Sequence, residues 1–278
     1  MTDMELKARL YEHWEDALKL YPKERIVALV LQGSQNYGLD DAESDVDTKL
    51  LLVPTLDEII FNKQPVSTTH IRDNDEHIDA KDIRLYWQCF RKGNPNFVEV
   101  LFTDYYIVNS MYFDLWEEMR ANRELVARVN PLIAAKAMMG MVQEKFHAME
   151  HRYPSRAEIV DRFGYDPKQL QHLIRMSWFL ETYVYDECCY KDILTLDYAN
   201  NGQVGMRAWL LDVKRGREYG LEKAREVAAD WLARAEHALT HAKEIYDGKE
   251  DEAVSAFMDE MLGKMIKKAI KKELEKGD

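Results

Sequence analysis

Residues 31–50 read LQGSQNYGLDDAESDVDTKL, and this stretch decides the fold. The residues before its glycine, 26–31 (IVALVL), are aliphatic and rich in β-branched types, and Gly33 follows closely, so we expect a buried strand that ends in a sharp turn. A glycine lets the backbone approach a ligand closely, and free N–H groups at the start of a helix or turn favour a phosphate. Ser34 would add a hydroxyl donor at the same place.

Two aspartates close the same stretch. Asp45 and Asp47 come just before the apolar run 50–53 (LLLV), so we expect them at the start of a second strand. Because side chains on a strand alternate with period two, both carboxylates should lie on one side. Two neighbouring carboxylates suit Mg²⁺, and a pair of such ions can clamp the attacking and leaving oxygens in nucleotidyl transfer. The plain alternative is a solvated acidic turn, but the strand-Gly-Ser pattern before it favours a metal site.

The residues that carry this pattern resemble a known family. GSQNYG at 33–38 and SDVD at 44–47 are similar to the signature of the DNA polymerase β-like nucleotidyltransferase superfamily, and in particular to bacterial and phage predicted nucleotidyltransferases. Those proteins carry two further blocks, which are similar to NPNFVEVL at 94–101 and to GYDPK at 164–168 followed by His172 and Arg175. The resemblance extends over residues 25–180.

The resemblance implies a third carboxylate on a later strand. Residues 66–72 and 76–80 are β-prone and flank the turn-rich 73–75 (DND), so they are predicted to form a hairpin. Asp79, between Ile78 and Ala80, fits the third position. Asp82 is the alternative, but it precedes a run with helical spacing and is expected to cap that helix. We therefore choose Asp79.

The resemblance also implies roles for these residues. Asp45 and Asp47 would hold Mg²⁺ or Mn²⁺ against the triphosphate of an NTP, with ATP the expected donor, while Asp79 would complete a second metal site or take the proton from the acceptor hydroxyl. In the nucleotide-binding loop, Gly33 and Ser34 would approach the phosphates. Tyr37 would stack on a base, although a packing tyrosine explains it equally well.

A second group of candidate nucleotide-binding residues lies further along the chain. Pro167 suits the first turn of a helix that Asp166 caps. Lys168, His172 and Arg175 would then share one helix face, since they are spaced i, i+4 and i+7. If that face meets the catalytic cleft, it can neutralise a triphosphate or the leaving pyrophosphate. The alternative is an exposed polar helix face.

Composition limits the possible functions. The chain has 278 residues, of which 46% are hydrophobic, and a net charge of −12. The negative charge makes non-specific DNA binding unlikely to be its task, because that binding depends on neutralising phosphates. No apolar stretch is long enough for a membrane span and the N-terminus does not read as a signal peptide, so we expect no membrane partner and a cytoplasmic location.

The pattern of elements changes near residue 130. Before it, strand and helix signals alternate, which predicts an α+β (α/β) fold with a small mixed sheet and flanking helices, in a catalytic domain of residues 1–130. After it, strand signals nearly vanish, which predicts an all-α domain of residues 131–278 packed on the active-site cleft. Helices are expected at 4–20, 82–92, 132–151, 167–185, 205–214, 221–246 and 251–275.

Two hypotheses for function follow. In the first, the chain is an enzyme that transfers a nucleoside monophosphate from an NTP to a hydroxyl, with release of pyrophosphate. The acceptor stays open between an RNA end, a protein side chain and a small molecule. In the second, the chain keeps the fold as a catalytically inactive nucleotide-binding or interaction protein. The two differ in whether Asp79 approaches Asp45 and Asp47.

Overall fold

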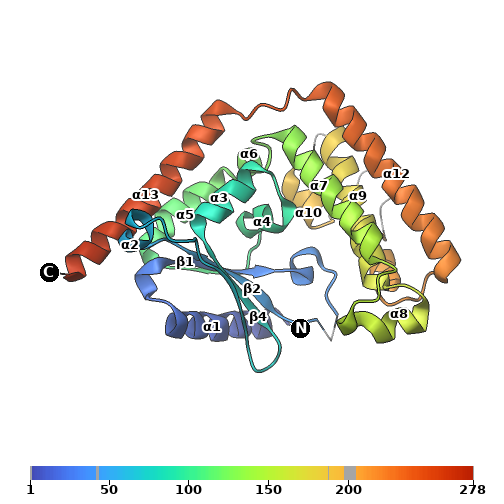
Figure 1. The fold of residues 1–278 in the computed structure, drawn as a ribbon, viewed down its shortest axis with the longest axis horizontal. Helices are drawn as coiled ribbons and strands as arrows, with labels where there is room; N and C mark the ends of the chain where they lie inside the picture. Colours follow the sequence, from blue (N-terminus) through green and yellow to red (C-terminus); the bar gives the residue numbers. More distant parts are fainter. Residues whose placement is uncertain (1, 42–43, 187, 197–204, 278) are drawn as a thin grey trace. The chain divides into compact units, whose positions relative to one another are not determined.

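The chain divides into two compact units. The structure, a computed structural model, describes residues 2–41, 44–186, 188–196 and 205–277. Unit 1 comprises residues 1–129 together with 250–278, and unit 2 comprises residues 130–249. Figure 1 shows the ribbon with its helices and strands labelled.

Unit 1 is built on a mixed five-stranded sheet in the order β3-β4-β2-β1-β5. β3 and β4 form the predicted antiparallel hairpin, β1 pairs antiparallel with both β2 and β5, and β2 pairs parallel with β4. The strands are β1 (Ile26–Gln32), β2 (Asp47–Leu52), β3 (Ser67–Ile71), β4 (His77–Asp82) and β5 (Tyr106–Val108). The α+β fold expected from the sequence, with a small mixed sheet and a helical region, is confirmed.

The two sides of the sheet differ in character. On one side, Leu50 and Leu52 of β2 and Ile78 and Ala80 of β4 pack in a core with apolar residues of α1 (Asp3–Leu20). On the other side, alternation brings up Asp47 and Lys49 of β2 and His77, Asp79 and Lys81 of β4. We call these five residues the polar face. Figure 1 shows α1 below the sheet and α3 (Ile83–Arg91) above it.

Helix α3 begins where the sequence predicted. Asp82 is its N-cap, because the Asp82 carboxylate accepts a hydrogen bond from the Arg84 backbone N–H at 2.8 Å. The same carboxylate pairs with the Arg84 guanidinium at 2.6 Å. Asp82 is therefore committed to this cap, and Asp79 remains the acidic residue of β4 on the polar face. The other helices of residues 1–129 are α2 (Leu56–Ile60), α4 (Pro95–Val98), α5 (Phe113–Ala121) and α6 (Arg123–Ala127).

The last helix, α13 (Glu252–Gly277), belongs to unit 1. The expected division placed residues 131–278 in one helical domain, whereas the structure groups 250–278 with the sheet. The physical reason is a buried methionine stripe at Met258, Met261 and Met265, which packs against the helices of unit 1, α3 among them. The indole of Trp87 in α3 also donates to the Met258 carbonyl at 2.6 Å.

Unit 2 is helical throughout its described residues. Its helices are α7 (Pro131–Ala148), α8 (Ala157–Phe163), α9 (Pro167–Tyr185), α10 (Tyr190–Leu194), α11 (Met206–Lys214) and α12 (Leu221–Ile245). Helix α9 is central, since α7, α10, α11 and α12 all pack on it and most of its residues are buried. Within the part of the chain that the structure describes, no helix combines the length and the apolar character needed to cross a bilayer.

A buried polar cluster fixes the residues on either side of Asp47. Glu76, whose side chain is 6% exposed, accepts a hydrogen bond from the Val46 backbone N–H at 3.3 Å. The buried His13 of α1 lies 2.9 Å from both Glu76 and the Thr48 hydroxyl. Its Nε2–H therefore donates to the carboxylate and its Nδ1 accepts from Thr48. Because Val46 and Thr48 flank Asp47, this cluster holds the aspartate segment from the core side.

The charge of Glu76 makes this cluster sensitive to acid. Burial raises the pKa of Glu76, but hydrogen bonds from His13 and Arg9 outweigh it and lower the pKa from 4.5 to about 2. A carboxylate with a lowered pKa stabilises the folded state fully above pH 4.5 and loses this contribution, up to about 3 kcal/mol, as the pH falls toward its folded pKa.

We therefore expect Glu76→Gln to lower the free energy of unfolding most at pH 7, and the gap from the wild type to shrink as the pH falls. Urea unfolding of both proteins at several pH values between 7 and 3 measures this gap. A gap that stays constant with pH would contradict the assignment. The exposed Glu260→Gln serves as a control that should show little difference at any pH.

Candidate active site

The turn after β1 depends on Gly33. Its φ of 97° and ψ of −157° lie in a region that only glycine adopts without strain. Residues Ser34–Tyr37 then form a single 3₁₀ turn, and Gly38 ends it with a φ of 66°. The Asn36 side-chain amide donates to the Leu31 carbonyl at 3.0 Å and ties the turn to the strand. The predicted strand and sharp turn are confirmed, and the turn continues as one 3₁₀ turn.

The turn lies beside Asp45. The Gln35 side-chain amide donates to the Asp45 backbone carbonyl at 2.7 Å. The Asp45 side chain is exposed and precedes the strand, whereas Asp47 is the first residue of β2. Between them, Val46 is buried in the core. The structure thus brings the candidate phosphate turn and the first candidate metal ligand together.

Asp47 and Asp79 share the polar face. The parallel register aligns Asp79 with Lys49, two residues after Asp47. A spacing of ~4.8 Å between strands and ~3.3 Å per residue along a strand puts the Cα atoms of the two aspartates about 8 Å apart. Asp47 accepts a hydrogen bond from the His77 backbone N–H at 2.9 Å. Both carboxylate oxygens of Asp79 instead lie 2.6 Å from the Lys81 ammonium.

The three predicted ligands do not form a ready-made cluster. Among the residues that the structure describes, no three His, Cys, Asp or Glu side chains gather as a group that could hold a metal ion. The donor set still fits a hard cation, because Asp45 and Asp47 carry carboxylates two residues apart around the start of β2, and Gln35 of the glycine turn contacts the Asp45 carbonyl. For Asp79 to bind the same ion, its carboxylate would have to release the Lys81 ammonium.

A buried network beneath the turn involves residues that the sequence patterns did not assign to the site. Glu99 and Lys49 are nearly fully buried and form an ion pair at 2.9 Å. The Tyr37 hydroxyl donates to the same Glu99 carboxylate, and the Lys49 ammonium also donates to the Asn96 carbonyl. Two sequence signals identify this pair. Lys49 follows Asp47 by two residues on the same strand, so both lie on one face, and Glu99 is the glutamate of the NPNFVE block at 94–99. The Tyr37 side chain is 6% exposed, which agrees with the interpretation that it packs inside the protein.

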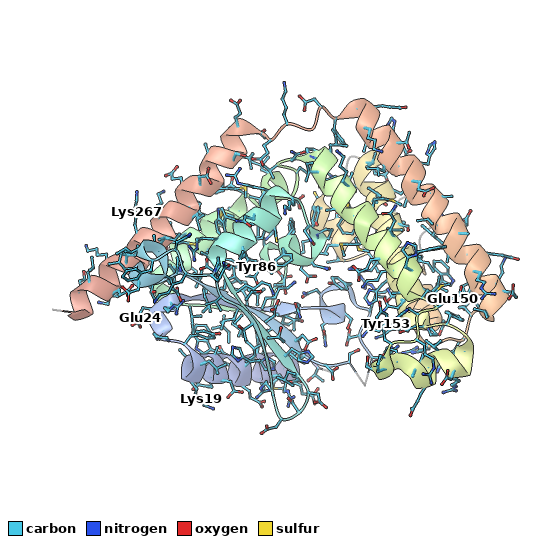
Figure 2. All side chains as sticks on the ribbon, viewed as in Figure 1. Lys19, Glu24, Tyr86, Glu150, Tyr153 and Lys267 are labelled. Carbon is cyan, nitrogen blue, oxygen red and sulfur yellow. The ribbon has the colours of Figure 1, made fainter. Side chains whose placement is uncertain are left out.

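An aromatic group closes the polar face on the side of α3. The Lys49 and Lys81 ammonium groups lie 5.5 and 5.9 Å from the centroid of the Phe97 ring. The Tyr86 ring is 5.4 Å from Phe97, and its hydroxyl has no hydrogen-bond partner among the described residues. Figure 2 labels Tyr86 between α3 and the sheet. Burial, and then the charge of Asp79, raises the pKa of Tyr86, so this hydroxyl stays protonated.

The second group of candidates lies in unit 2, on α9. Asp166 caps this helix by accepting from the Lys168 backbone N–H at 2.9 Å, as predicted, and Arg156 holds the Asp166 carboxylate at 2.7 Å. Lys168 is exposed and Arg175 is buried. Burial, together with the nearby charges of Arg175, Lys168, Lys145 and Lys214, lowers the pKa of His172 to about 3. His172 is thus neutral at pH 7, and Lys145 of α7 and Lys214 of α11 join the basic cluster around it.

The Lys49–Glu99 pair provides a test of the network. Lys49→Met leaves the Glu99 charge buried without its ammonium partner, which typically costs about 3–5 kcal/mol of folding free energy. We expect the double variant Lys49→Met with Glu99→Met to be less destabilised than Lys49→Met alone, as measured by urea unfolding. The exposed pair Lys264–Glu260, at 2.7 Å, gives a matched control whose Lys264→Met variant should leave the free energy of unfolding nearly unchanged. Additive single effects at Lys49 and Glu99 would contradict a coupled pair.

Comparisons with known proteins identify the family of the chain. Among solved structures, a nucleotidyltransferase-like protein from Exiguobacterium sibiricum 255-15 is similar, with 14% identity, coverage of 84% of this chain and 74% of that chain, and a TM-score of 0.29. No curated protein matches the chain. The family model described as "RlaP: RNA repair pathway DNA polymerase beta family" matches residues 11–263. The chain therefore belongs to this family and is a nucleotidyltransferase of the polymerase β-like superfamily, which confirms the resemblance found in the sequence.

Proposed function

We propose that the chain transfers a nucleoside monophosphate from an NTP to a hydroxyl at an RNA end and releases pyrophosphate. One observation carries the proposal: the glycine turn of residues 33–38 lies against Asp45, and Asp47 and Asp79 follow on one face of the sheet. The RNA acceptor is the choice among three acceptor classes that agrees with the family's description as an RNA repair pathway family. ATP is the proposed donor.

In this proposal Asp45, Asp47 and Asp79 hold Mg²⁺ or Mn²⁺. The ion would neutralise charge on the phosphates and on the attacking and leaving oxygens. Ser34 offers its hydroxyl and the turn its backbone N–H groups to a phosphate, where Gly33 allows the close approach. Asp79 is proposed either to complete the metal site or to take the proton from the acceptor hydroxyl.

The basic cluster of unit 2 is proposed to bind phosphates. Lys168 is exposed at the start of α9, and Arg175 lies two turns further on. His172 would act as a neutral hydrogen-bond donor, since its pKa of about 3 keeps it uncharged at pH 7. Lysine ammonium groups attract triphosphate oxygens strongly, which is why the cluster suits a nucleotide and not a neutral ligand.

Label transfer tests the enzymatic function. The full chain is incubated with Mg²⁺ and each of four α-labelled NTPs, with RNA oligonucleotides that carry either a free or a blocked terminal hydroxyl. We expect label on the RNA with the free hydroxyl, and a loss of at least ~100-fold in Asp47→Asn, because it removes a metal-binding charge. Equal labelling by wild type and Asp47→Asn would contradict the site. Nucleotide binding without transfer to any acceptor would favour the inactive nucleotide-binding alternative.

A separate variant tests the basic cluster. Lys168→Ala should raise the KM for the NTP about tenfold, as expected for the loss of a charged hydrogen bond of about 1.5 kcal/mol. Initial rates over a range of NTP concentrations measure this change. Lys136→Ala, which removes another exposed lysine of unit 2, is the matched control and should leave KM unchanged. An unchanged KM in Lys168→Ala would remove Lys168 from the phosphate site.

A further inference from the structure

The charges on the polar face compensate one another. Lys49 pairs with Glu99, and Lys81 pairs with Asp79. Asp47 accepts from the His77 backbone N–H and has the His77 ring Nδ1 at 3.2 Å. A divalent ion that needs Asp79 must therefore compete with an ammonium group that already contacts both carboxylate oxygens.

The two lysines differ in how firmly they are held. The Lys49 side chain is 5% exposed and its partner Glu99 is 4% exposed, so this pair cannot exchange its partners for water without leaving buried charges. Lys81 is 20% exposed and Asp79 is 18% exposed. Water can therefore solvate both groups as they separate. Lysine also has a flexible four-carbon stem, so its ammonium can move several ångströms without any backbone change.

The geometry points to Lys81 as a further substrate-binding residue of the transfer site, and this inference rests on the proposed function. We propose that the Lys81 ammonium occupies the Asp79 carboxylate until the metal ion and the nucleotide bind, and that it then contacts a phosphate oxygen of the nucleotide. Lys81 follows Asp79 by two residues on the same strand face, so the released ammonium stays beside the polar face. It adds a positive charge where a triphosphate would otherwise meet three aspartates.

Electrostatics favours this exchange. At the same distance, the attraction between a divalent cation and a carboxylate is stronger than that between an ammonium and a carboxylate, because the cation carries twice the charge. When Lys81 leaves the Asp79 carboxylate, the phosphates of the nucleotide become its new negatively charged partner. The Phe97 ring, 5.9 Å from the ammonium, lies beside it and offers a second weak attraction during the movement.

The test separates metal binding from turnover. Mn²⁺ binding to the full-length wild type and to Lys81→Met is measured by electron paramagnetic resonance, first with Mn²⁺ alone. Removal of the competing ammonium should tighten Mn²⁺ binding by at least about threefold, since it frees a carboxylate for a cation. A second titration adds a non-hydrolysable ATP analogue with Mn²⁺. In this titration Lys81→Met should bind the nucleotide about tenfold more weakly than the wild type, because a charged hydrogen bond to phosphate is lost.

Further variants make the test decisive. Lys264→Met removes an exposed lysine that pairs with Glu260 on α13, and should change neither affinity. Lys81→Arg should recover much of the nucleotide affinity, since it keeps the charge. In the Asp79→Asn background, Lys81→Met should no longer tighten Mn²⁺ binding. Thermal unfolding checks that each variant is folded.

The outcomes distinguish this inference from the proposed function. Opposite changes, tighter for Mn²⁺ alone and weaker for the nucleotide, support the role of Lys81 even if no acceptor is ever labelled. Unchanged or weaker Mn²⁺ binding in Lys81→Met would overturn it, because the lysine would then only orient Asp79. Absence of Mn²⁺ binding in every protein would overturn it as well. RNA labelling that survives in Lys81→Met with normal nucleotide affinity would leave the transferase proposal standing without Lys81.

Discussion

The parallel pairing of β2 with β4 is the constraint on which the site depends. It aligns Lys49 with Asp79 and Leu50 with Ala80. The register of this one pair therefore decides which side chains enter the core and which charged side chains lie together on the polar face. A shift by one residue would turn the aspartates into the core and the leucines toward the polar side. The same pairing joins two strands that α2 and β3 separate along the chain, and it therefore brings candidate ligands from both strands to one face.

Buried polar groups hold that face from both sides. On the core side, Glu76 binds the Val46 backbone and His13 links Glu76 to Thr48. On the other side, the Glu99 carboxylate joins Tyr37 of the glycine turn to Lys49 of β2. Buried ionised groups are costly unless they are paired and hydrogen-bonded, and both carboxylates meet this condition. These two networks tie the glycine turn and the aspartate segment to the sheet.

The last helix illustrates how a local pattern can mislead about organisation. Residues 251–275 have the composition of a helix, and the structure has one at Glu252–Gly277. The helix also carries exposed lysines, among them Lys267, which Figure 2 labels on α13. Helical spacing identifies an apolar stripe but not the surface that the stripe covers. The buried Met258 and its bond from Trp87 assign the helix to unit 1, so that the helical unit is an insertion between parts of the first.

The sequence by itself determined the features that depend on neighbours along the chain. These are the strand before Gly33, the sharp turn at this glycine, the hairpin, the caps at Asp82 and Asp166, and the helix of residues 167–185. Each follows from steric or hydrogen-bonding preferences within a few residues. Family membership also followed, because its motifs are short and local. Only the tertiary structure decided that Lys81 occupies Asp79, that Lys49 pairs with Glu99 and that His172 is neutral. The physical reason is that the partner of a charge, and the water it loses, are set by strand register and burial between segments far apart in the chain.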